Sequence, residues 1–388
     1  MWEVLKVFVV ALIAFTSASL LLVVVNELLD QGLGLFAIYQ LLPFALPIAL
    51  QYALPATILF AVCSVYGRIS ADNEVMALTA SGIAPIKVIS PTLVLGFLIS
   101  PVAVWLNDLA VSWGEQGIEK VVLNSIEEIT YRYLSTEGTY SYPNAFSIVV
   151  DGIGPDGREL ISPEITVNSF SPPMTITARS GSLKFDAATV TLVASLIDCD
   201  IVQGSRVMLH HPGELKQEIP LGNGFNSAGA RLRPQQIALR NIGPESSKQQ
   251  DSLRKAKELL AARTAMALTA GRYDWLDDST THQSIAELAN GNERMYKLNT
   301  EPWRRWASGF SCFFFVWVGV PLAIWMRTAD YSTCFGMCFL PTILIFYPFM
   351  MLGADRAKDG SWPPCSVWLG NIVLLAIGAW WLRKIHRN

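Results

Sequence analysis

One short polar segment, lying between two long uncharged stretches, carries residues that could bind a partner. It covers residues 71–83, and Asp72, Asn73 and Glu74 follow its first residue. We expect a helix here, because carboxylates in a first turn suit the helix dipole and Gly82 is a typical helix-ending residue. The segment therefore predicts an acidic helix exposed on a short loop.

The chemistry of such a helix is recognition rather than catalysis. Glu74 could pair with an arginine of a cytoplasmic partner, while Val75, Met76 and Leu78 fill an apolar cleft of that partner. The alternative is a short interfacial linker whose acidic side chains are only solvated. Both interpretations stay open on these residues alone.

The composition places this helix in an integral membrane protein. Of the 388 residues, 52% are hydrophobic and 16% are charged, and the mean hydropathy is +0.36, which is wrong for a soluble domain of this size. Six stretches lack Asp, Glu, Lys and Arg over a length near the ~20 residues that an apolar helix needs to cross a bilayer. They run from Val7 to Asn26, Gln31 to Gly67, Val88 to Asn107, Trp306 to Met326, Tyr331 to Ala354 and Gly360 to Leu382.

The basic residues predict which side of the membrane each loop occupies, since Lys and Arg on short loops tend to stay in the cytoplasm. Arg327 and the C-terminal Arg383, Lys384 and Arg387 mark one side. With six spans, the N-terminus, the loop of residues 68–87 and the C-terminus share this side. We therefore expect cytoplasmic termini and a large outer loop between the third and fourth spans.

The outer loop has the composition of a soluble domain, and its residues 130–221 show the pattern of short strands. Met174, Ile176 and Ala178 recur at every second position, as in a strand with one apolar face. This predicts an antiparallel β domain whose apolar face is either the core of a small sandwich or a groove left open for an acyl chain. The same alternation recurs at Val190, Leu192, Ala194 and Leu196, and the expected turns lie at Asn144, Asp156-Gly157, Pro172-Pro173, Gly181 and Pro212-Gly213.

A polar stretch and a helical region follow the β domain. Residues 226–250 are rich in Gly, Pro, Ser and Gln and are predicted to form a linker. Helical periodicity then covers residues 251–300, with one helix from Ser252 to Ala270 and another from Gln283 to Asn299 that leads into the fourth span.

Signatures of enzymes and of nucleic-acid binding are missing from the sequence. It contains no G-x-x-x-x-G-K-[ST] phosphate loop, so we expect no cofactor, and ATP would have to be bound by a partner. The four histidines lack the spacing of a zinc site, so no metal is expected. Cys199 is the sole cysteine of the outer domain and cannot form a disulfide within it. A net charge of -3 without a basic stripe argues against nucleic acid as a partner.

Two features of the chain occur together. The first is the layout of three spans, a large outer β domain and three more spans. The second is the sequence of the loop after the second span, which contains Arg68-Ile69-Ser70, Asn73-Glu74 and Ala80-Ser81-Gly82-Ile83. The chain resembles the LptF/LptG-type permease family of the lipopolysaccharide exporter over most of its length. The most specific part of the resemblance is a Glu followed eight residues later by a Gly.

The resemblance implies that the acidic helix is a coupling helix, with Glu74 contacting a cytoplasmic ABC ATPase. It also implies that the outer domain is a β-jellyroll that receives lipid and passes it to a periplasmic bridge protein. The coupling residues would be Asp72, Asn73, Glu74, Met76, Leu78 and Gly82.

The start of the fourth span, Glu301-Pro302-Trp303-Arg304-Arg305-Trp306-Ala307, is also similar to the family. Arg304 and Arg305, with Trp303 beside them, could bind lipid phosphates through their guanidinium groups. Alternatively, these side chains anchor the helix at the membrane interface. Family members often carry basic residues near the outer end of the first span, where this chain has Asn26, Glu27 and Asp30.

We therefore expect a membrane α-helical protein with six transmembrane helices in a 3+3 layout and an inserted, β-jellyroll-like antiparallel domain. Residues 1–107 would hold three spans with a coupling helix at about 70–84, residues 108–305 the periplasmic region, and residues 306–388 the last three spans and a basic tail.

The expected function is that of a permease subunit that extracts lipopolysaccharide or a related lipid from the bacterial inner membrane. It would work with an ABC ATPase, a second, homologous or identical permease, and the bridge protein. Two alternatives remain: a permease that exports lipoprotein or peptide, and a membrane scaffold without transport activity whose periplasmic domain binds a partner.

Overall fold

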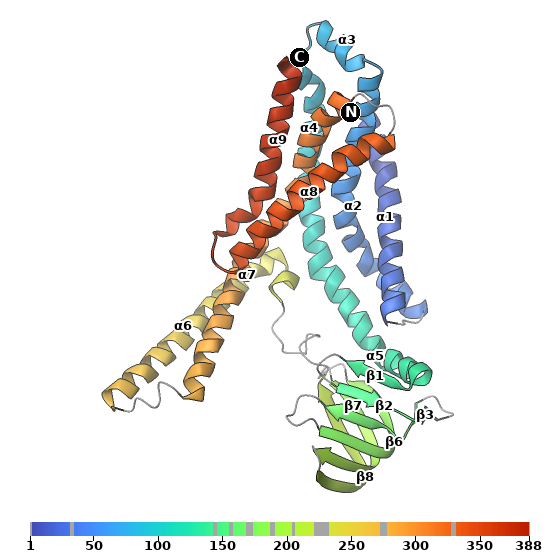
Figure 1. Ribbon diagram of the computed structural model, residues 1–388, viewed down its shortest axis with the longest axis vertical. Coiled ribbons are helices and arrows are strands. Elements are labelled where there is room, and N and C mark those ends of the chain that lie inside the picture. Colours follow the sequence, from blue (N-terminus) through green and yellow to red (C-terminus); the bar gives the residue numbers. More distant parts are fainter. Residues whose placement is uncertain are drawn as a thin grey trace. The chain divides into compact units, whose positions relative to one another are not determined.

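The computed structural model describes most of the chain as helices and one β-sheet (Figure 1). The described residues are 2–31, 35–142, 146–154, 158–167, 174–186, 191–203, 206–220, 233–271, 278–326 and 331–387. They fall into two compact units, which are described separately. The first comprises residues 1–20, 46–114 and 233–388, and the second residues 21–45 and 115–232.

Six of the described helices are long and apolar enough to cross a membrane, which confirms the six predicted spans. The third span runs from α4 through a π-helical turn, η1 (Ala110–Glu115), into α5 (Gln116–Glu137). A short 3₁₀ turn, η4 (Pro364–Trp368), forms the start of the sixth. The other helices of the spans are α1 (Trp2–Gln31), α2 (Leu35–Ala71), α4 (Pro85–Leu109), α7 (Ser279–Met326), α8 (Tyr331–Lys358) and α9 (Leu369–Arg387).

The core of the first unit lies where α2, α4 and α7 pack together. Leu59 of α2 and Val316 of α7 are fully buried in it. Gly309 allows α4 and α7 to approach closely, because a Cβ atom there would lie 2.7 Å from the backbone nitrogen of Val104. Larger side chains are excluded at this crossing, so the contact between the two helices is fixed by packing.

The N-terminal residues, the loop after α2 and the C-terminal helix end lie at one end of this unit (Figure 1). Arg68 of α2 contacts Glu3 of α1, and Lys384 of α9 lines the same groove as residues of the loop. These contacts place together the three segments that the charge pattern assigned to one side of the membrane.

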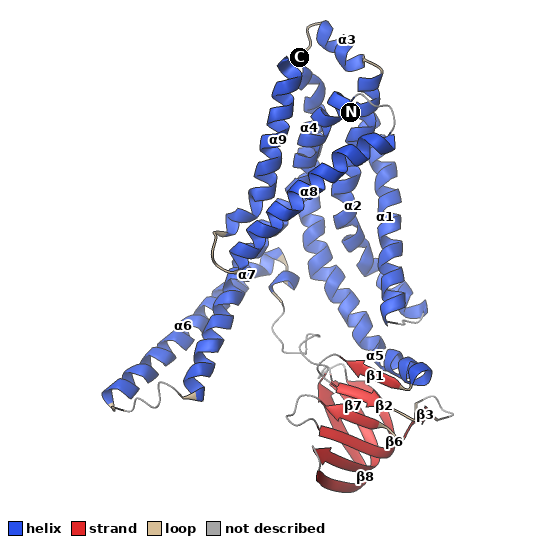
Figure 2. Ribbon diagram, viewed as in Figure 1, coloured by secondary structure: helices blue, strands red, loops and turns tan. Residues whose placement is uncertain are grey.

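The second unit contains α5 and an eight-stranded antiparallel sheet that curls into a half-barrel (Figure 2). The predicted inserted antiparallel domain is thereby confirmed. The strand order is β1-β2-β5-β6-β4-β3, with β7 beside β6 and β8 beside β7. The strands are β1 (Thr139–Tyr142), β2 (Phe146–Val149), β3 (Gly152–Ile153), β4 (Leu160–Ile161), β5 (Glu164–Val167), β6 (Met174–Asp186), β7 (Thr191–Gln203) and β8 (Arg206–Pro220).

The inner face of the sheet is apolar, as the alternation predicts at Ile176, Ala194 and Leu196, all fully buried. The expectation of strands from residue 130 onward is wrong, because α5 continues to Glu137 and the first strand begins at Thr139. The aromatic and β-branched residues there resemble a strand in sequence. They lie on a helix whose Tyr131 and Leu134, one turn apart, pack into the sheet core.

Two predicted turns lie inside long strands instead. Gly181 belongs to β6, and a Cβ atom there would lie 2.8 Å from the side chain of Leu196, so glycine serves close strand packing. Gly213 belongs to β8 and has φ +124°. The pairing of β7 with β8 shifts register between Ile197 and Cys199, so this glycine lies at an irregularity rather than at a chain reversal. The other expected turns, Asn144, Asp156-Gly157 and Pro172-Pro173, and Val190 lie outside the described residues.

The predicted linker over residues 226–250 is wrong in its second half. After a 3₁₀ turn, η2 (Pro234–Gln236), helix α6 runs from Leu239 to Thr269 and so begins 13 residues before Ser252. Its polar residues are compatible with a helix that buries only one side, at Ile242, Gln249 and Leu253. Residues 226–232 lie outside the described part of the chain.

Helices α6 and α7 form a hairpin, and α7 continues without a break into the fourth span (Figure 1). Gly291 of α7 allows the approach, since a Cβ atom there would lie 2.6 Å from the side chain of Leu253. Gln249 donates a hydrogen bond to the carbonyl oxygen of Gly291 (3.1 Å). The two helices of the hairpin are thus in close contact at Gly291.

Candidate functional site

The predicted acidic helix is present but shorter than residues 71–83. Helix α3 runs from Glu74 to Ala80 and is bounded by two residues in left-handed conformations. Asn73 has φ 61°, and the chain changes direction there after α2. Gly82 has φ 88°, a backbone conformation that would be strained in a residue with a Cβ atom. The Gly82 N–H donates to the carbonyl of Thr79 (3.0 Å), so the last turn is closed by backbone bonds.

The faces of α3 divide its residues into an outward set and an inward set. Glu74 is exposed and stands at the first position of the helix, where its carboxylate meets the positive end of the dipole. Leu78, one turn later on the same face, is 38% exposed, and Met76 is 47% exposed. Val75 is only 7% exposed and packs into the protein. The prediction that Val75 fills a partner's cleft is therefore wrong, because its side chain anchors α3 to its own chain.

A groove of about 790 Å³ runs beneath α3. Ser70 at its edge donates a hydrogen bond to the carbonyl of Ile324 (2.7 Å), which joins the end of α2 to the end of α7. Lys384 lines the groove, and its ammonium group lies 5.0 to 5.3 Å from the ring centres of three tryptophans. These contacts join the ends of α2, α7 and α9 to one another at the groove that α3 also lines, and Val75 packs α3 into the same core.

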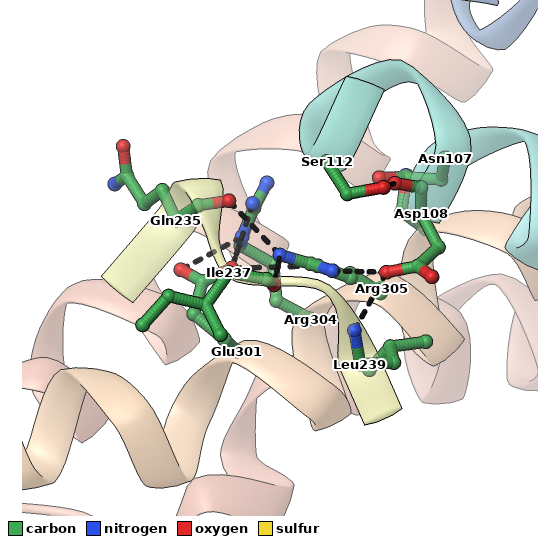
Figure 3. A network of polar contacts seen from close by, with 10 residues as sticks. Asn107, Asp108, Ser112, Gln235, Ile237, Leu239, Glu301, Arg304 and Arg305 are labelled. Carbon is green, nitrogen blue, oxygen red and sulfur yellow. Dashed lines mark hydrogen bonds and ion pairs between the residues drawn. The ribbon is translucent and has the colours of Figure 1, made fainter. Parts of the chain in front are cut away.

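The second polar cluster surrounds Arg305, at the start of the membrane-spanning part of α7 (Figure 3). This side chain is fully buried and bonds to Asp108 of α4. Its Nη2 also donates to the carbonyl oxygens of Gln235 (2.9 Å) and Ile237 (2.7 Å). Asp108 in turn accepts a bond from the backbone N–H of Leu239 (2.8 Å). The segment 235–239 thus forms a strap that is held across the ends of α4 and α7.

The remaining charges of this cluster are paired as well. Glu301 is fully buried and accepts hydrogen bonds from Arg304 Nε (3.0 Å) and Nη2 (2.8 Å). It also lies 4.0 Å from Arg305 Nε. Two carboxylates and two guanidinium groups balance one another, which is the condition under which buried charges are tolerated.

This geometry corrects the prediction that Arg305 binds lipid phosphate. Its guanidinium group is inaccessible and is used to hold the strap. The side chain of Arg304 is 26% exposed and forms an ion pair with Glu301. Trp303 is 46% exposed. Of the three predicted lipid-binding residues, only Trp303 and part of Arg304 are open to a ligand.

Asp108 is not among the site residues predicted from the sequence. The available signal was its place at the end of an otherwise uncharged span, since an ionisable residue there requires a partner. The strap could not be found, because its contacts are made by backbone carbonyls whose residue types carry no signal. Among the described residues, no group of three His, Cys, Asp or Glu side chains could hold a metal ion.

Six spans, an inserted half-barrel sheet and a short exposed helix between the second and third spans define a multi-pass membrane protein with an inserted β domain. The sequence model of the family described as lipopolysaccharide export system permease LptF/LptG matches residues 1–384. The chain belongs to this family, which confirms the resemblance noted in the sequence. No curated protein matches the chain. The membership identifies a multi-pass lipopolysaccharide export permease, which is not itself an enzyme.

Proposed function

We propose that this chain is the permease through which a cytoplasmic ABC ATPase extracts lipopolysaccharide from the bacterial inner membrane, with α3 as the coupling helix. The observation that carries the proposal is the division of α3 into two faces. Glu74 and Leu78 point away from the protein, while Val75 fixes the helix to the ends of the spans. An exposed carboxylate beside an exposed leucine suits a partner with an arginine next to an apolar cleft.

The proposed mechanism is mechanical. Closure of the ATPase on ATP would pull α3, and the bond from Ser70 to the carbonyl of Ile324 would carry this movement to α2 and α7. Such a movement would narrow a lipid cavity shared with a second permease subunit, which is either homologous or identical. We propose that the N-terminus, α3 and the C-terminus are cytoplasmic, in agreement with the basic residues at this end.

The half-barrel sheet would receive the acyl chains and pass them to a periplasmic bridge protein. In support, its inner face is apolar, and Met174, Ala178, Ile201 and Leu215 are only partly buried around the core. Apolar side chains of this kind could rearrange to accept a hydrocarbon chain.

The test is to replace Glu74 by alanine or lysine and to measure binding of the ATPase that co-purifies with the chain. Loss of one partner of a desolvated charged hydrogen bond costs ~2–5 kcal/mol, so the dissociation constant should rise roughly 30-fold or more. Asp359→Ala is the matched control, because it removes an exposed acid from the loop after α8, at the opposite face in the proposed topology.

Normal ATPase binding and normal lipid release by both Glu74 variants would contradict the coupling role. The lipid and the proteins recovered with the native chain distinguish the alternatives. A co-purifying ATPase with lipoprotein or peptide would indicate another exporter, whereas recovery of neither an ATPase nor a second permease would favour a scaffold.

A further inference from the structure

A second groove lies between α1 and α2, at the end of the unit that carries α3, and its volume is about 360 Å³. Each helix contributes one face to it. On α2, Phe60, Ser64 and Arg68 follow one another at intervals of four residues. The full lining consists of Glu3, Lys6, Val7, Phe60, Ser64, Val65 and Arg68.

The basic side chains of the groove have more positive charge and more N–H donors than its single carboxylate can pair. Arg68 contacts Glu3 through one nitrogen, Nη2, and a guanidinium group has five N–H donors. Lys6 is exposed, and its ammonium group lies 5.5 Å from the ring centre of Trp2. Among the described residues it forms no ion pair. The groove therefore contains two cations and one carboxylate, and favours an anion.

A buried hydroxyl gives an independent indication of a ligand. Ser64 is only 3% exposed, and its Oγ has no hydrogen-bond partner in the described structure although the residue lines the groove. Buried hydroxyls normally form a hydrogen bond, because a buried hydroxyl without a partner has lost the hydrogen bonds that it made with water. An oxygen-rich anion bound beside Lys6 and Arg68 would supply the missing acceptor once the Ser64 hydroxyl, which is not accessible from the groove in the orientation shown, rotates toward it.

The walls of the groove show that this anion carries an apolar part. Phe60 lies two turns before Arg68 on α2, and Val7 and Val65 are further apolar residues of the lining. From Arg68 to Phe60 the α2 face extends about 12 Å along the helix, at 1.5 Å per residue. A ligand with an anionic head at Arg68 and a hydrocarbon chain toward Phe60 matches this order. A free inorganic anion would make no use of the apolar residues.

We propose that this groove binds the phosphate headgroup of an anionic phospholipid from the leaflet at the α3 end, and that the lipid joins α1 to α2. This link through the lipid would contribute most to the attachment of α1. Only 17% of the apolar window of α1 is buried, against 61% for α2, so α1 has few other attachments within the chain. A lipid in the groove would add to the single ion pair between Arg68 and Glu3.

The test is to titrate the purified full-length chain, in an uncharged detergent, with short-chain phosphatidylglycerol and to measure bound lipid by native mass spectrometry. Lys6→Gln and Ser64→Ala should each weaken binding roughly tenfold, because each removes a hydrogen bond to a charged group. Lys87→Gln is the control, since it removes an exposed lysine from the first turn of α4, the helix that follows α3, and this lysine does not line the groove.

A variant with the opposite effect separates recognition from misfolding. Glu3→Gln removes the carboxylate that competes for Arg68 and should strengthen binding about twofold to fivefold. Unchanged affinity in folded Lys6→Gln and Ser64→Ala would overturn the proposal, as would weaker binding by Glu3→Gln. Phosphatidylcholine binding as tightly as phosphatidylglycerol, or inorganic phosphate competing as strongly as the lipid, would also overturn it. None of these measurements depends on transport or on the ATPase.

Discussion

Removal of Asp108 tests whether the buried charge cluster holds the strap in place. In Asp108→Ala, the fully buried Arg305 loses its direct carboxylate partner and the N–H of Leu239 loses its acceptor. Removing one member of a buried ion pair costs about 3–5 kcal/mol. Glu301 lies 4.0 Å from Arg305 Nε and compensates part of this, so we expect a loss of stability near the lower end, about 3 kcal/mol.

The assay is unfolding of the purified protein by a denaturing detergent, together with limited proteolysis between η2 and α6. Glu258→Ala is the control, because its ion pair with Arg254 is exposed on both sides (63% and 77%) and should contribute about 0.5 kcal/mol or less. The double variant Asp108→Ala/Arg305→Met removes both charges and should be more stable than Asp108→Ala alone.

Two results would refute this reasoning. The first is a change of less than about 0.5 kcal/mol in Asp108→Ala, which would mean that Arg305 does not require its partner. The second is a double variant less stable than Asp108→Ala, which would mean that Arg305 stabilises the fold even without that carboxylate. Faster cleavage of the strap in Asp108→Ala, but not in Glu258→Ala, is expected if Asp108 positions residues 235–239.

Two further predictions concern other polar contacts. Burial raises the pKa of Tyr131, whose hydroxyl accepts a hydrogen bond from the backbone N–H of Leu183 (2.8 Å). Tyr131→Phe leaves this N–H without an acceptor and should lower the free energy of unfolding in detergent by about 1–3 kcal/mol. An equal loss in the control Tyr296→Phe, at an exposed tyrosine, would contradict the role given to Tyr131. At the tip of the α6–α7 hairpin, the bond from Thr280 (2.6 Å) is the main cause that lowers the pKa of Asp278. The resulting stabilisation is present above the unfolded pKa and is lost as the pH falls through the lowered value, so hydrogen exchange in the first turn of α7 should accelerate there in the wild type but not in Asp278→Asn.

Part of the architecture follows from the sequence because it depends on residue chemistry over long windows. Six uncharged stretches predict six spans, since an apolar segment of about 20 residues matches the thickness of the bilayer and satisfies its backbone there by forming a helix. Alternation at Ile176, Ala194 and Leu196 requires strands with one buried face. The exposed acid Glu74 and the helix-ending Gly82 were likewise readable, because both act locally.

What the tertiary structure alone decided is where each side chain points and what it contacts. Val75 faces its own chain and Leu78 faces away, although both are apolar residues of one short helix. Arg305 reads as a lipid ligand in sequence, yet it is buried because Asp108, almost two hundred residues earlier, approaches it through the packing of α4 on α7. Polar residues 239–250 form a helix because α7 covers one of their faces. Such contacts join segments that are distant in the chain, and a single sequence carries no local signal of which segments will meet.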